Sequence, residues 1–364
     1  MKIGILGGGQ LGRMLALAGY PLGFQFRLLD PSPQACGGQV AELISGDLND
    51  EALLDRFAAG LDAVTVEWEN IAVPSAKYLA QRLPFWPPPA AVEVSQDRLS
   101  EKTLFNRLGI ETAPYAAVDM PADLAAAVEK IGLPAILKTR RMGYDGLGQW
   151  RLQTQDDVAK AAAELDAPAI LEGFVAFERE LSVIAVRGQD GAAAFYPLAE
   201  NSHRDGILRL SYAPSPDVTA LQRRRAEELA WAVLEELNYV GVLAIELFEV
   251  GNRLLANEMA PRVHNSGHWS IDGAVTSQFE NHVRAVAGLP LGSTDAVGFS
   301  AMINLIGDHP PVETLASIPG AHVHLYGKSA RAGRKLGHVN LRDDNPLALR
   351  SRTEAALAAL NISL

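Results

Sequence analysis

The chain has 364 residues and a formal net charge of −11, from 43 acidic and 32 basic residues, so it lacks the basic surface that general nucleic-acid or anionic-membrane binding requires. Hydrophobic residues make up 48% and charged residues 21%, which is typical of a globular protein with two or three domains. No segment approaches the roughly 20 apolar residues of a membrane span, and the single cysteine, Cys36, excludes an intramolecular disulfide. We therefore expect a cytoplasmic protein that binds neither nucleic acid nor membranes.

Strands and helices alternate in the first part of the chain. Residues 2–6 have the pattern of a buried strand, residues 10–23 carry apolar side chains at helical spacing, and "FQFRLLD" and "DAVTVEW" are two further strands. This alternation predicts a parallel sheet with right-handed crossovers. The prolines at 87–89 mark its edge, so we predict a first domain over residues 1–96.

The rest of the chain divides into two further units. A helix from Asp97, followed by alternating strands and helices, predicts a small α+β unit over residues 97–175. The remaining unit, residues 176–364, contains the long helix "TALQRRRAEELAWAVLEELN" and the strands "VGVLAIELFEV" and "RLLANEMAP". We expect the tail, about residues 298–364, to form another short sheet that ends in a helix.

A glycine loop follows the first strand. Gly7, Gly9 and Gly12 satisfy the pattern G-x-G-x-x-G between a strand and a helix, and Asp30 ends the second strand. This is a fair dinucleotide fingerprint, so an NAD-dependent dehydrogenase is one hypothesis. The same turn offers backbone N–H groups and a helix N-terminus to the phosphate of a sugar monophosphate, or the glycines serve only the turn.

A second glycine loop lies between two strands in the middle unit. Lys138 is embedded in the apolar strand "AILKTR", and the loop that follows contains Gly143, Gly146 and Gly148. A glycine hairpin between antiparallel strands can cover phosphates, with Lys138 as a point charge against them. Alternatively, the stem of Lys138 packs at an edge while its ammonium stays in water.

Several carboxylates also interrupt apolar strands. Glu172, Gly173 and Val175 offer backbone edge contacts to an adenine, and Glu180 offers a carboxylate to ribose hydroxyls, although such acids are more often solvated.

Glu246 and Glu258 lie in strands joined by a Gly-Asn turn, which predicts an antiparallel hairpin that brings the two acids together. Buried like charges are costly unless a cation neutralises them, and oxygen ligands indicate Mg²⁺ rather than zinc. The other interpretation, two glutamates on a wet sheet face, conflicts with the apolar residues that flank both.

Two basic or polar loops complete the candidate site. The loop after Glu258 predicts anion or substrate binding rather than zinc, because glycine and asparagine exclude a helix; it carries Arg262, His264, Asn265, Ser266 and His268. The segment "YGKSARAGRKLGH" is positively charged in an otherwise acidic protein. Such a segment is typical of a phosphate clamp, or of an exposed hairpin with solubility charges. It carries Lys328, Arg331, Arg334 and Lys335.

These blocks occur in an order that resembles the ATP-grasp superfamily, and within it the N5-carboxyaminoimidazole ribonucleotide synthases of purine biosynthesis. The matching blocks are "GILGGGQLGRM", "VTVEWENI", "DRLSEKTLF", "GYDGLGQW", "SHRDGILRLS", "NEMAPRVHNSGHW" and "YGKSARAGRKLGH". The resemblance implies an α/β and α+β fold: an N-terminal Rossmann-like (pre-ATP-grasp) parallel-sheet domain, a small middle domain and a C-terminal domain. It also implies a homodimer that converts 5-aminoimidazole ribonucleotide, bicarbonate and MgATP to the N5-carbamate, ADP and phosphate.

The resemblance implies a role for each matching position. Contacts with ATP fall on the phosphate-binding Arg98 and Lys138, on the covering loop Gly143, Tyr144, Asp145, Gly146, Leu147, Gly148 and Gln149, on the adenine-lining Glu172, Gly173, Phe174 and Val175, and on Glu180 and His203. Magnesium falls on Glu246 and Glu258, beside Asn257. The ribonucleotide is expected to contact Gly9, Gln10, Leu11, Glu69, Tyr144, Asp145, Arg262, His264, Lys328, Arg331, Arg334 and Lys335.

Catalysis is assigned to Lys138, Asp145, Arg262 and His264. The lysine and arginine would neutralise phosphate charge, and Asp145 and His264 are the candidates for a general base. One residue departs from the family pattern, because Leu147 stands where a basic residue is usual, so its contact is missing or is supplied by Arg140 or Arg141. Besides the dehydrogenase, a formate-dependent phosphoribosylglycinamide transformylase-type ligase and a non-enzymatic nucleotide sensor remain as alternative hypotheses.

Overall fold

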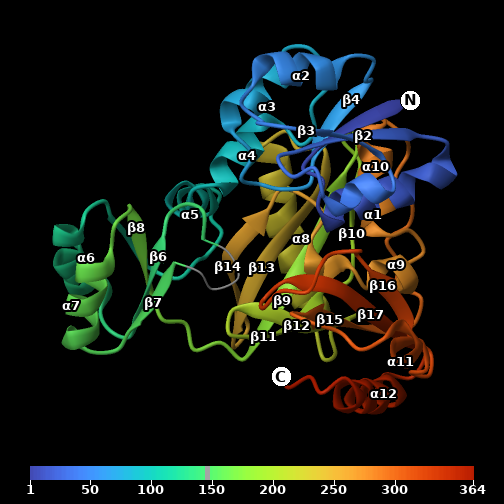
Figure 1. Ribbon diagram of the computed structural model, residues 1–364. Helices are drawn as coiled ribbons and strands as arrows, with labels where there is room; N and C mark the ends of the chain where they lie inside the picture. The colour runs from blue at the N-terminus through green and yellow to red at the C-terminus, as the bar shows by residue number, and fades with distance from the viewer. Residues whose placement is uncertain (144–147) are drawn as a thin grey trace.

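The computed structural model describes residues 1–143 and 148–364, and it contains three β-sheets that meet around one cavity. In Figure 1 the N-terminal sheet lies at the top, the small sheet of the middle unit stands to one side, and the large sheet occupies the centre. None of the helices in these described ranges is long and apolar enough to cross a membrane.

The N-terminal sheet is entirely parallel, with strand order β3-β2-β1-β4, which confirms the predicted parallel-sheet domain. Its strands are β1 (Lys2–Leu6), β2 (Gln25–Asp30), β3 (Glu42–Ser45) and β4 (Ala63–Val66). Its helices are α1 (Gln10–Gly19), α2 (Glu51–Ala58), α3 (Val73–Ala80) and α4 (Pro89–Ser95), with short 3₁₀ turns η1 (Tyr20–Leu22) and η2 (Cys36–Gln39). Because the strands are parallel, the residues after β1 and after β4 lie at the same edge of the sheet.

The middle sheet is antiparallel, with strand order β5-β8-β6-β7. It contains β5 (Tyr115–Val118), β6 (Ala135–Thr139), β7 (Gln149–Leu152) and β8 (Ala169–Gly173), together with η3 (Pro121–Asp123), α6 (Leu124–Ile131) and α7 (Gln155–Glu164). Its own apolar core is formed by β-strand residues such as Leu137 and Leu171 and by Val128 of α6. The second glycine loop joins the paired strands β6 and β7, as the sequence predicted.

The third sheet has nine strands, which are antiparallel to their neighbours. They are β9 (Arg179–Arg187), β10 (Ala193–Phe195), β11 (Ala199–Arg204), β12 (Ile207–Ala213), β13 (Gly241–Val250), β14 (Arg253–Ala260), β15 (Phe299–Ile306), β16 (His322–Leu325) and β17 (Lys335–Asp343). The helices are α8 (Ala220–Glu236), α9 (Ser270–Gly273), α10 (Gln278–Val286), α11 (Val312–Ala316) and α12 (Pro346–Ala359), with the 3₁₀ turn η4 (Asn265–Gly267).

The tail does not form the separate short sheet that we expected. Strand β15 pairs with β12, so β15, β17 and β16 extend the nine-stranded sheet, and α12 packs against β15 and β17. Pairing between strands so far apart in the chain depends on tertiary contacts, which local patterns do not specify.

The three units share apolar cores. Leu15 of α1 lies in one buried cluster with Val242 of β13 and with Phe279 of α10, and α1 packs against α10. Leu104 of α5 (Arg98–Arg107) belongs to the cluster beneath the nine-stranded sheet with Leu243. Helix α5 therefore packs on the large sheet although it precedes the middle sheet in the chain, and the boundaries at residues 97 and 175 stay predictions.

The first glycine loop gives a test of local backbone strain. A Cβ at Gly7, whose φ is +99°, would lie 2.4 Å from Cγ of Glu67, whereas one at Gly60, whose φ is +73°, meets nothing within 4 Å. We expect Gly60→Ala to lower the free energy of unfolding by about 1 kcal/mol, from left-handed strain alone. Gly7→Ala adds a steric clash and should cost about 3 kcal/mol. Urea denaturation of the two variants measures the difference, and equal losses would contradict the proposed clash.

Candidate functional site

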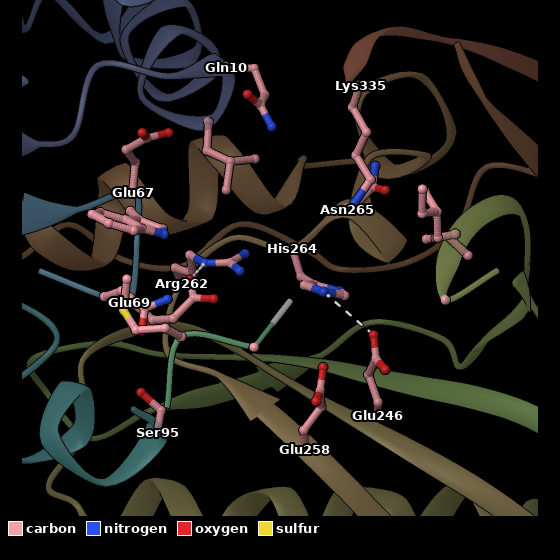
Figure 2. A pocket seen from close by; sticks show the side chains of 18 of the residues that line it. Gln10, Glu67, Glu69, Ser95, Glu246, Glu258, Arg262, His264, Asn265 and Lys335 are labelled. Atoms are coloured by element: carbon pink, nitrogen blue, oxygen red, sulfur yellow. Dashed lines mark hydrogen bonds and ion pairs between the residues drawn. The ribbon is translucent and has the colours of Figure 1, made fainter. Parts of the chain in front are cut away.

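A cavity of about 700 Å³ lies where the three sheets meet. Predicted site residues that line it are Gln10, Leu11, Glu69, Arg98, Gly143, His203, Glu246, Glu258, Arg262, His264, Lys328, Arg331, Arg334 and Lys335. Figure 2 shows Gln10 and Glu67 on one wall and Glu246 and Glu258 on the opposite wall, with Arg262 and His264 between them. The segments that sequence reasoning treated separately therefore face a single space.

Other predicted residues do not line the cavity in the described part of the chain. They are Gly9, Lys138, Gly148, Gln149, Glu172, Gly173, Phe174, Val175, Glu180 and Asn257. Lys138 and Glu172 lie buried together beneath Arg98, and Glu180 contacts His203, so these three remain connected to the lining. Tyr144, Asp145, Gly146 and Leu147 lie outside the described residues.

The two acidic strands form the predicted hairpin, and Glu246 and Glu258 are direct partners in the register of β13 and β14. The register shifts next to this pair, so that Leu247 pairs with Ala256 and Asn257 is the extra residue of a β-bulge. A bulge redirects a side chain and so lets consecutive residues serve one site. The buried Oδ1 of Asn257 has no hydrogen-bond partner among the described residues. Two carboxylates and a free amide oxygen are the donors that Mg²⁺ accepts beside nucleotide phosphates.

The pKa values of the two glutamates are shifted in opposite directions. Burial would raise the pKa of Glu258, but the ion pair with Arg98, 2.6 Å away, outweighs it and lowers the pKa to about 2. Burial and the neighbouring Glu258 raise the pKa of Glu246 to about 7, against the opposing effect of His203. Glu258 is therefore held ionised, whereas Glu246 readily takes up a proton when no cation is bound.

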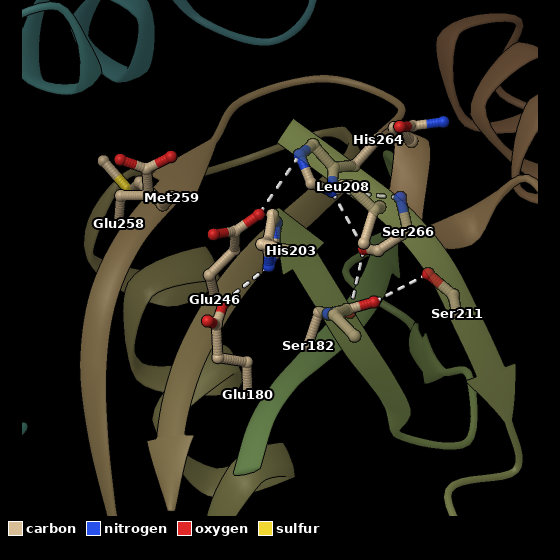
Figure 3. A network of polar contacts seen from close by, with 12 residues as sticks. Glu180, Ser182, His203, Leu208, Ser211, Glu246, Glu258, Met259, His264 and Ser266 are labelled. Atoms are coloured by element: carbon tan, nitrogen blue, oxygen red, sulfur yellow. Dashed lines mark hydrogen bonds and ion pairs between the residues drawn. The ribbon is translucent and has the colours of Figure 1, made fainter. Parts of the chain in front are cut away.

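Two histidines flank Glu246 (Figure 3). Nδ1 of His203 lies 2.6 Å from Glu180; burial opposes protonation, but this hydrogen bond and nearby carboxylates raise the pKa of His203. His264 behaves differently, because burial together with Arg262 and Lys335 lowers its pKa to about 3. His264 is therefore neutral near pH 7 but has a low affinity for a proton, and this low affinity weakens the hypothesis that it acts as a general base.

A buried chain of hydroxyl and amide groups holds the His264 ring (Figure 3). Its Nδ1 lies 2.8 Å from Oγ of Ser266, which accepts a hydrogen bond from Ser182. Asn201 donates to Ser182 and accepts from Ser211, at 3.1 and 2.7 Å. Fully satisfied buried networks of this kind fix side-chain orientation.

The lysine predicted to contact phosphate is part of a buried ion cluster. Nζ of Lys138 lies 3.0 Å from Oε2 of Glu172, and the fully buried Lys102 lies 3.4 Å from the same oxygen. Burial would raise the pKa of Glu172, but the two lysines outweigh it and lower the pKa to about 2. The second oxygen of Glu172, Oε1, is buried and has no hydrogen-bond partner among the described residues.

Three backbone N–H groups of the glycine loop after β1 are occupied by carboxylates. Gly9 and Gly12 donate their N–H groups to the two oxygens of Glu67, at 2.8 and 3.1 Å, and Gly8 donates to Asp30 at 2.8 Å. Burial raises the pKa of Glu67 despite these hydrogen bonds. The N–H group of Gly9 is therefore occupied by Glu67 and is not available for the phosphate contact that we expected.

One basic side chain contacts this loop, and others line the same cavity. Lys328 donates to Oε1 of Gln10 at 2.8 Å, and burial lowers its pKa. Arg262 is ion-paired with Glu69, and Arg334 donates to Ser329 at 2.9 Å. The cavity thus has both basic and acidic side chains near the glycine loop, including Lys328 and Glu67, and the carboxylate pair near the hairpin.

Sequence reasoning missed several residues of the site. Glu67 follows a buried parallel strand two positions before Glu69, so the alternating acids in "VTVEWENI" were an available signal. Lys102 had only a weak signal, a charge on a helix that is polar overall. Arg140 and Arg141, expected to substitute for a basic residue at position 147, are both ion-paired with Asp97.

Comparison with protein families matches three models along the chain. Residues 1–96 match a ribonucleotide synthetase preATP-grasp domain, residues 103–279 match an ATP-grasp domain, and residues 300–352 match a phosphoribosylaminoimidazole carboxylase C-terminal domain.

Similar proteins cover nearly the whole chain. An N5-carboxyaminoimidazole ribonucleotide synthase from Pseudomonas aeruginosa is 52% identical over 97% of both chains. The crystal structure of an N5-carboxyaminoimidazole ribonucleotide synthetase from Thermus thermophilus has a TM-score of 0.95 at 57% identity, over 100% of this chain and 99% of that one. A synthase from Aspergillus clavatus, in complex with ADP and 5-aminoimidazole ribonucleotide, has a TM-score of 0.92 at 31% identity, over 99% and 98% of the two chains.

The buried ion cluster leads to a prediction about stability. Glu172→Gln leaves two buried ammonium groups without their shared counter-charge and should lower the free energy of unfolding by about 3 kcal/mol at pH 7. A matched control, Glu236→Gln, removes the exposed ion pair with Arg107 and should cost less than about 1 kcal/mol.

The pH dependence of the same variants gives a second measurement. Because the folded pKa of Glu172 is lowered from 4.5 to about 2, its stabilisation is present above pH 4.5 and is lost as the pH falls toward 2. Urea unfolding across this range should show that loss in the wild type and not in Glu172→Gln. If the free energy of unfolding of Glu172→Gln depends on pH in this range as that of the wild type does, the cluster does not act through Glu172.

Proposed function

Because the chain belongs to the N5-carboxyaminoimidazole ribonucleotide synthase family of ADP-forming ATP-grasp ligases, we propose that it carboxylates the exocyclic amine of 5-aminoimidazole ribonucleotide with bicarbonate and MgATP. The observation that carries the proposal is that one cavity is lined both by Glu246 and Glu258 and by the first glycine loop with Lys328. The wall formed by the glutamates suits a nucleoside triphosphate with its cation, and the wall formed by the first glycine loop suits a sugar phosphate.

ATP is proposed to lie between the middle sheet and the nine-stranded sheet, with its phosphates near Lys138 and Arg98. Both cations are buried and ion-paired, so they are held in place before any nucleotide binds. An oxygen of bicarbonate attacks the γ-phosphorus, the bond from that phosphorus to the bridging oxygen breaks, and ADP leaves, which gives carboxyphosphate. Fixed positive charge favours this step because negative charge spreads over the phosphoryl oxygens.

Magnesium is proposed to bind Glu246 and Glu258, with the free oxygen of Asn257 beside them. Among the described residues there is no cluster of three or more histidine, cysteine or acidic side chains suited to a metal, which fits a cation completed by phosphate oxygens. When bound, Mg²⁺ would neutralise phosphate charge. Before it binds, Arg98 keeps Glu258 ionised.

The ribonucleotide is proposed to place its phosphate at Gln10, Leu11 and Lys328. Its amine then lies toward Glu69, whose carboxylate is fixed by Arg262 and accepts an N–H. The amine nitrogen attacks the carbon of carboxyphosphate, or of CO₂ released from it; the bond from that carbon to the phosphate oxygen breaks, and the phosphate takes up the proton that the nitrogen loses. Water would destroy the intermediate, and the loop from Gly143 to Gln149, part of which lies outside the described residues, is the proposed cover.

Two alternative hypotheses make different demands on this site. A dinucleotide at the first glycine loop would need the N–H groups that Glu67 occupies, which disfavours the dehydrogenase. A formate-dependent transformylase shares the fold and differs in its acyl donor, so only the assay separates it. The family resemblance also leads us to propose a cytoplasmic homodimer, which light scattering of the purified protein tests for assembly.

The direct test is ADP release by the purified protein with MgATP, bicarbonate and 5-aminoimidazole ribonucleotide. We expect release to require all three compounds and to be unchanged when formate is added. Release that needs formate instead of bicarbonate would indicate the transformylase, and tight NADH binding without MgATP binding would overturn the proposal.

The magnesium site predicts how two carboxylate variants behave. Glu258→Gln should lower kcat by about 10²-fold or more while ATP still binds, because charge neutralisation in the transition state is lost. Glu246→Gln should raise the Mg²⁺ concentration for half-maximal rate, and excess EDTA should abolish ADP release. Steady-state rates and calorimetric ATP binding measure these effects. The control Glu235→Gln, on the exposed face of α8, should leave all three quantities unchanged.

A further inference from the structure

We propose that Glu67 is a positioning and specificity-determining residue, whose carboxylate fills half of the anion site at the first glycine loop and leaves room there for a single phosphate group. The proposal rests on the function proposed above. It concerns a residue that contacts the loop rather than the reacting atoms.

The loop has four relevant N–H groups at the start of α1. Two of them, on Gly9 and Gly12, point to Oε1 and Oε2 of Glu67 at 2.8 and 3.1 Å. The other two belong to Gln10 and Leu11, which line the cavity, and the structure records no acceptor for either among the described residues. Helix N-termini favour anions, so this end of α1 is divided between an internal carboxylate and an external anion.

The glycines provide the space for the carboxylate. A Cβ at Gly7 would lie 2.4 Å from Cγ of Glu67, and a Cβ at Gly9 would lie 2.7 Å from its Oε1. In a dinucleotide site the same absence of side chains lets a pyrophosphate approach the backbone. Here the space that a second phosphate would need is filled by Glu67.

The charge of Glu67, like the space that it fills, disfavours a second phosphate at the loop. Lys328 lies beside the loop through its hydrogen bond to Gln10, and the positive charge of Arg262 opposes the rise in the pKa of Glu67. Arg262 already pairs with Glu69, so it is not free to offset a further anion, and a second phosphate would lie directly against Glu67 with like charge. The phosphate is therefore confined to the Gln10–Leu11 side, which fixes the distance from there to Glu69 and to the amine.

The test uses Glu67→Ala with small carboxylates as replacements for the missing side chain. We expect kcat/KM for 5-aminoimidazole ribonucleotide to fall about tenfold or more, with KM for ATP changed less than twofold, because charged hydrogen bonds to two backbone donors are lost. Added acetate should restore much of the loss by binding the freed N–H groups of Gly9 and Gly12. Sodium chloride at the same ionic strength should not.

A matched control separates positioning from stability. Asp50 accepts N–H groups from Ala52 and Leu53 at the start of α2 in the same domain, so it performs the same kind of capping away from the cavity. Asp50→Ala should lower the melting temperature and leave kcat/KM for the ribonucleotide unchanged. If Glu67→Ala loses no more kcat/KM than Asp50→Ala, or if acetate has no effect, Glu67 does not position the phosphate.

The selectivity for one phosphate has its own measurement. Pyrophosphate and orthophosphate are compared as inhibitors competitive with the ribonucleotide at saturating MgATP. Relative to the wild type, Glu67→Ala should bind pyrophosphate about tenfold more tightly against orthophosphate, and acetate should remove that difference. An unchanged ratio would overturn the selectivity.

The same comparison, measured as the ligand-induced shift in melting temperature, requires no turnover. A wild type without ribonucleotide-dependent ADP release would therefore refute the proposed function while still leaving Glu67 testable.

Discussion

Charged side chains buried on one face of α5 tie the middle sheet to the nine-stranded sheet. Arg98, Glu101 and Lys102 follow the spacing of one helical face, and each contacts β14: Arg98 pairs with Glu258, Glu101 accepts the N–H of Met259, and Lys102 donates to the carbonyl of Ala256. Lys102 also pairs with Glu172 of β8. Since a buried charge without a partner is strongly destabilising, this set of contacts restricts how the two sheets can sit relative to each other. The alignment of Lys138 with the acidic hairpin depends on it.

The same constraint explains why the acidic wall is ready to accept a cation. Arg98 compensates Glu258, whereas Glu246 lies beside the histidines, and burial together with Glu258 raises its pKa to about 7. Two like charges at partner positions of neighbouring strands repel each other, and a divalent cation relieves that repulsion. Under the proposed function, magnesium would therefore replace the proton that can neutralise Glu246 before nucleotide and cation bind.

Local patterns predicted those parts of the site that lie within one supersecondary element. The Gly-Asn turn and the apolar flanks were enough to pair Glu246 with Glu258, and the alternation of strands and helices was enough for the parallel sheet. The bulge at Asn257 was not predictable, because a register shift depends on how both strands pack against the rest of the sheet. Lys102 was missed for a related reason: its helix is polar overall, and only the burial of that one face by β14 gives the lysine its role. The continuation of the large sheet into the tail likewise depends on the pairing of β12 with β15, about 90 residues apart in the chain.

The glycine loop shows most clearly where a motif stops being informative. G-x-G-x-x-G specifies a turn, a helix N-terminus and free space beside the backbone, and each of these is present here. What occupies the space is decided by Glu67, which lies 58 positions beyond Gly9 and directly follows β4, the strand that pairs with β1. In a parallel sheet the residues that follow neighbouring strands meet at one edge, so the ligand of such a loop depends on two segments rather than one. A carboxylate after the adjacent strand turns a dinucleotide fingerprint into a site with room for one phosphate.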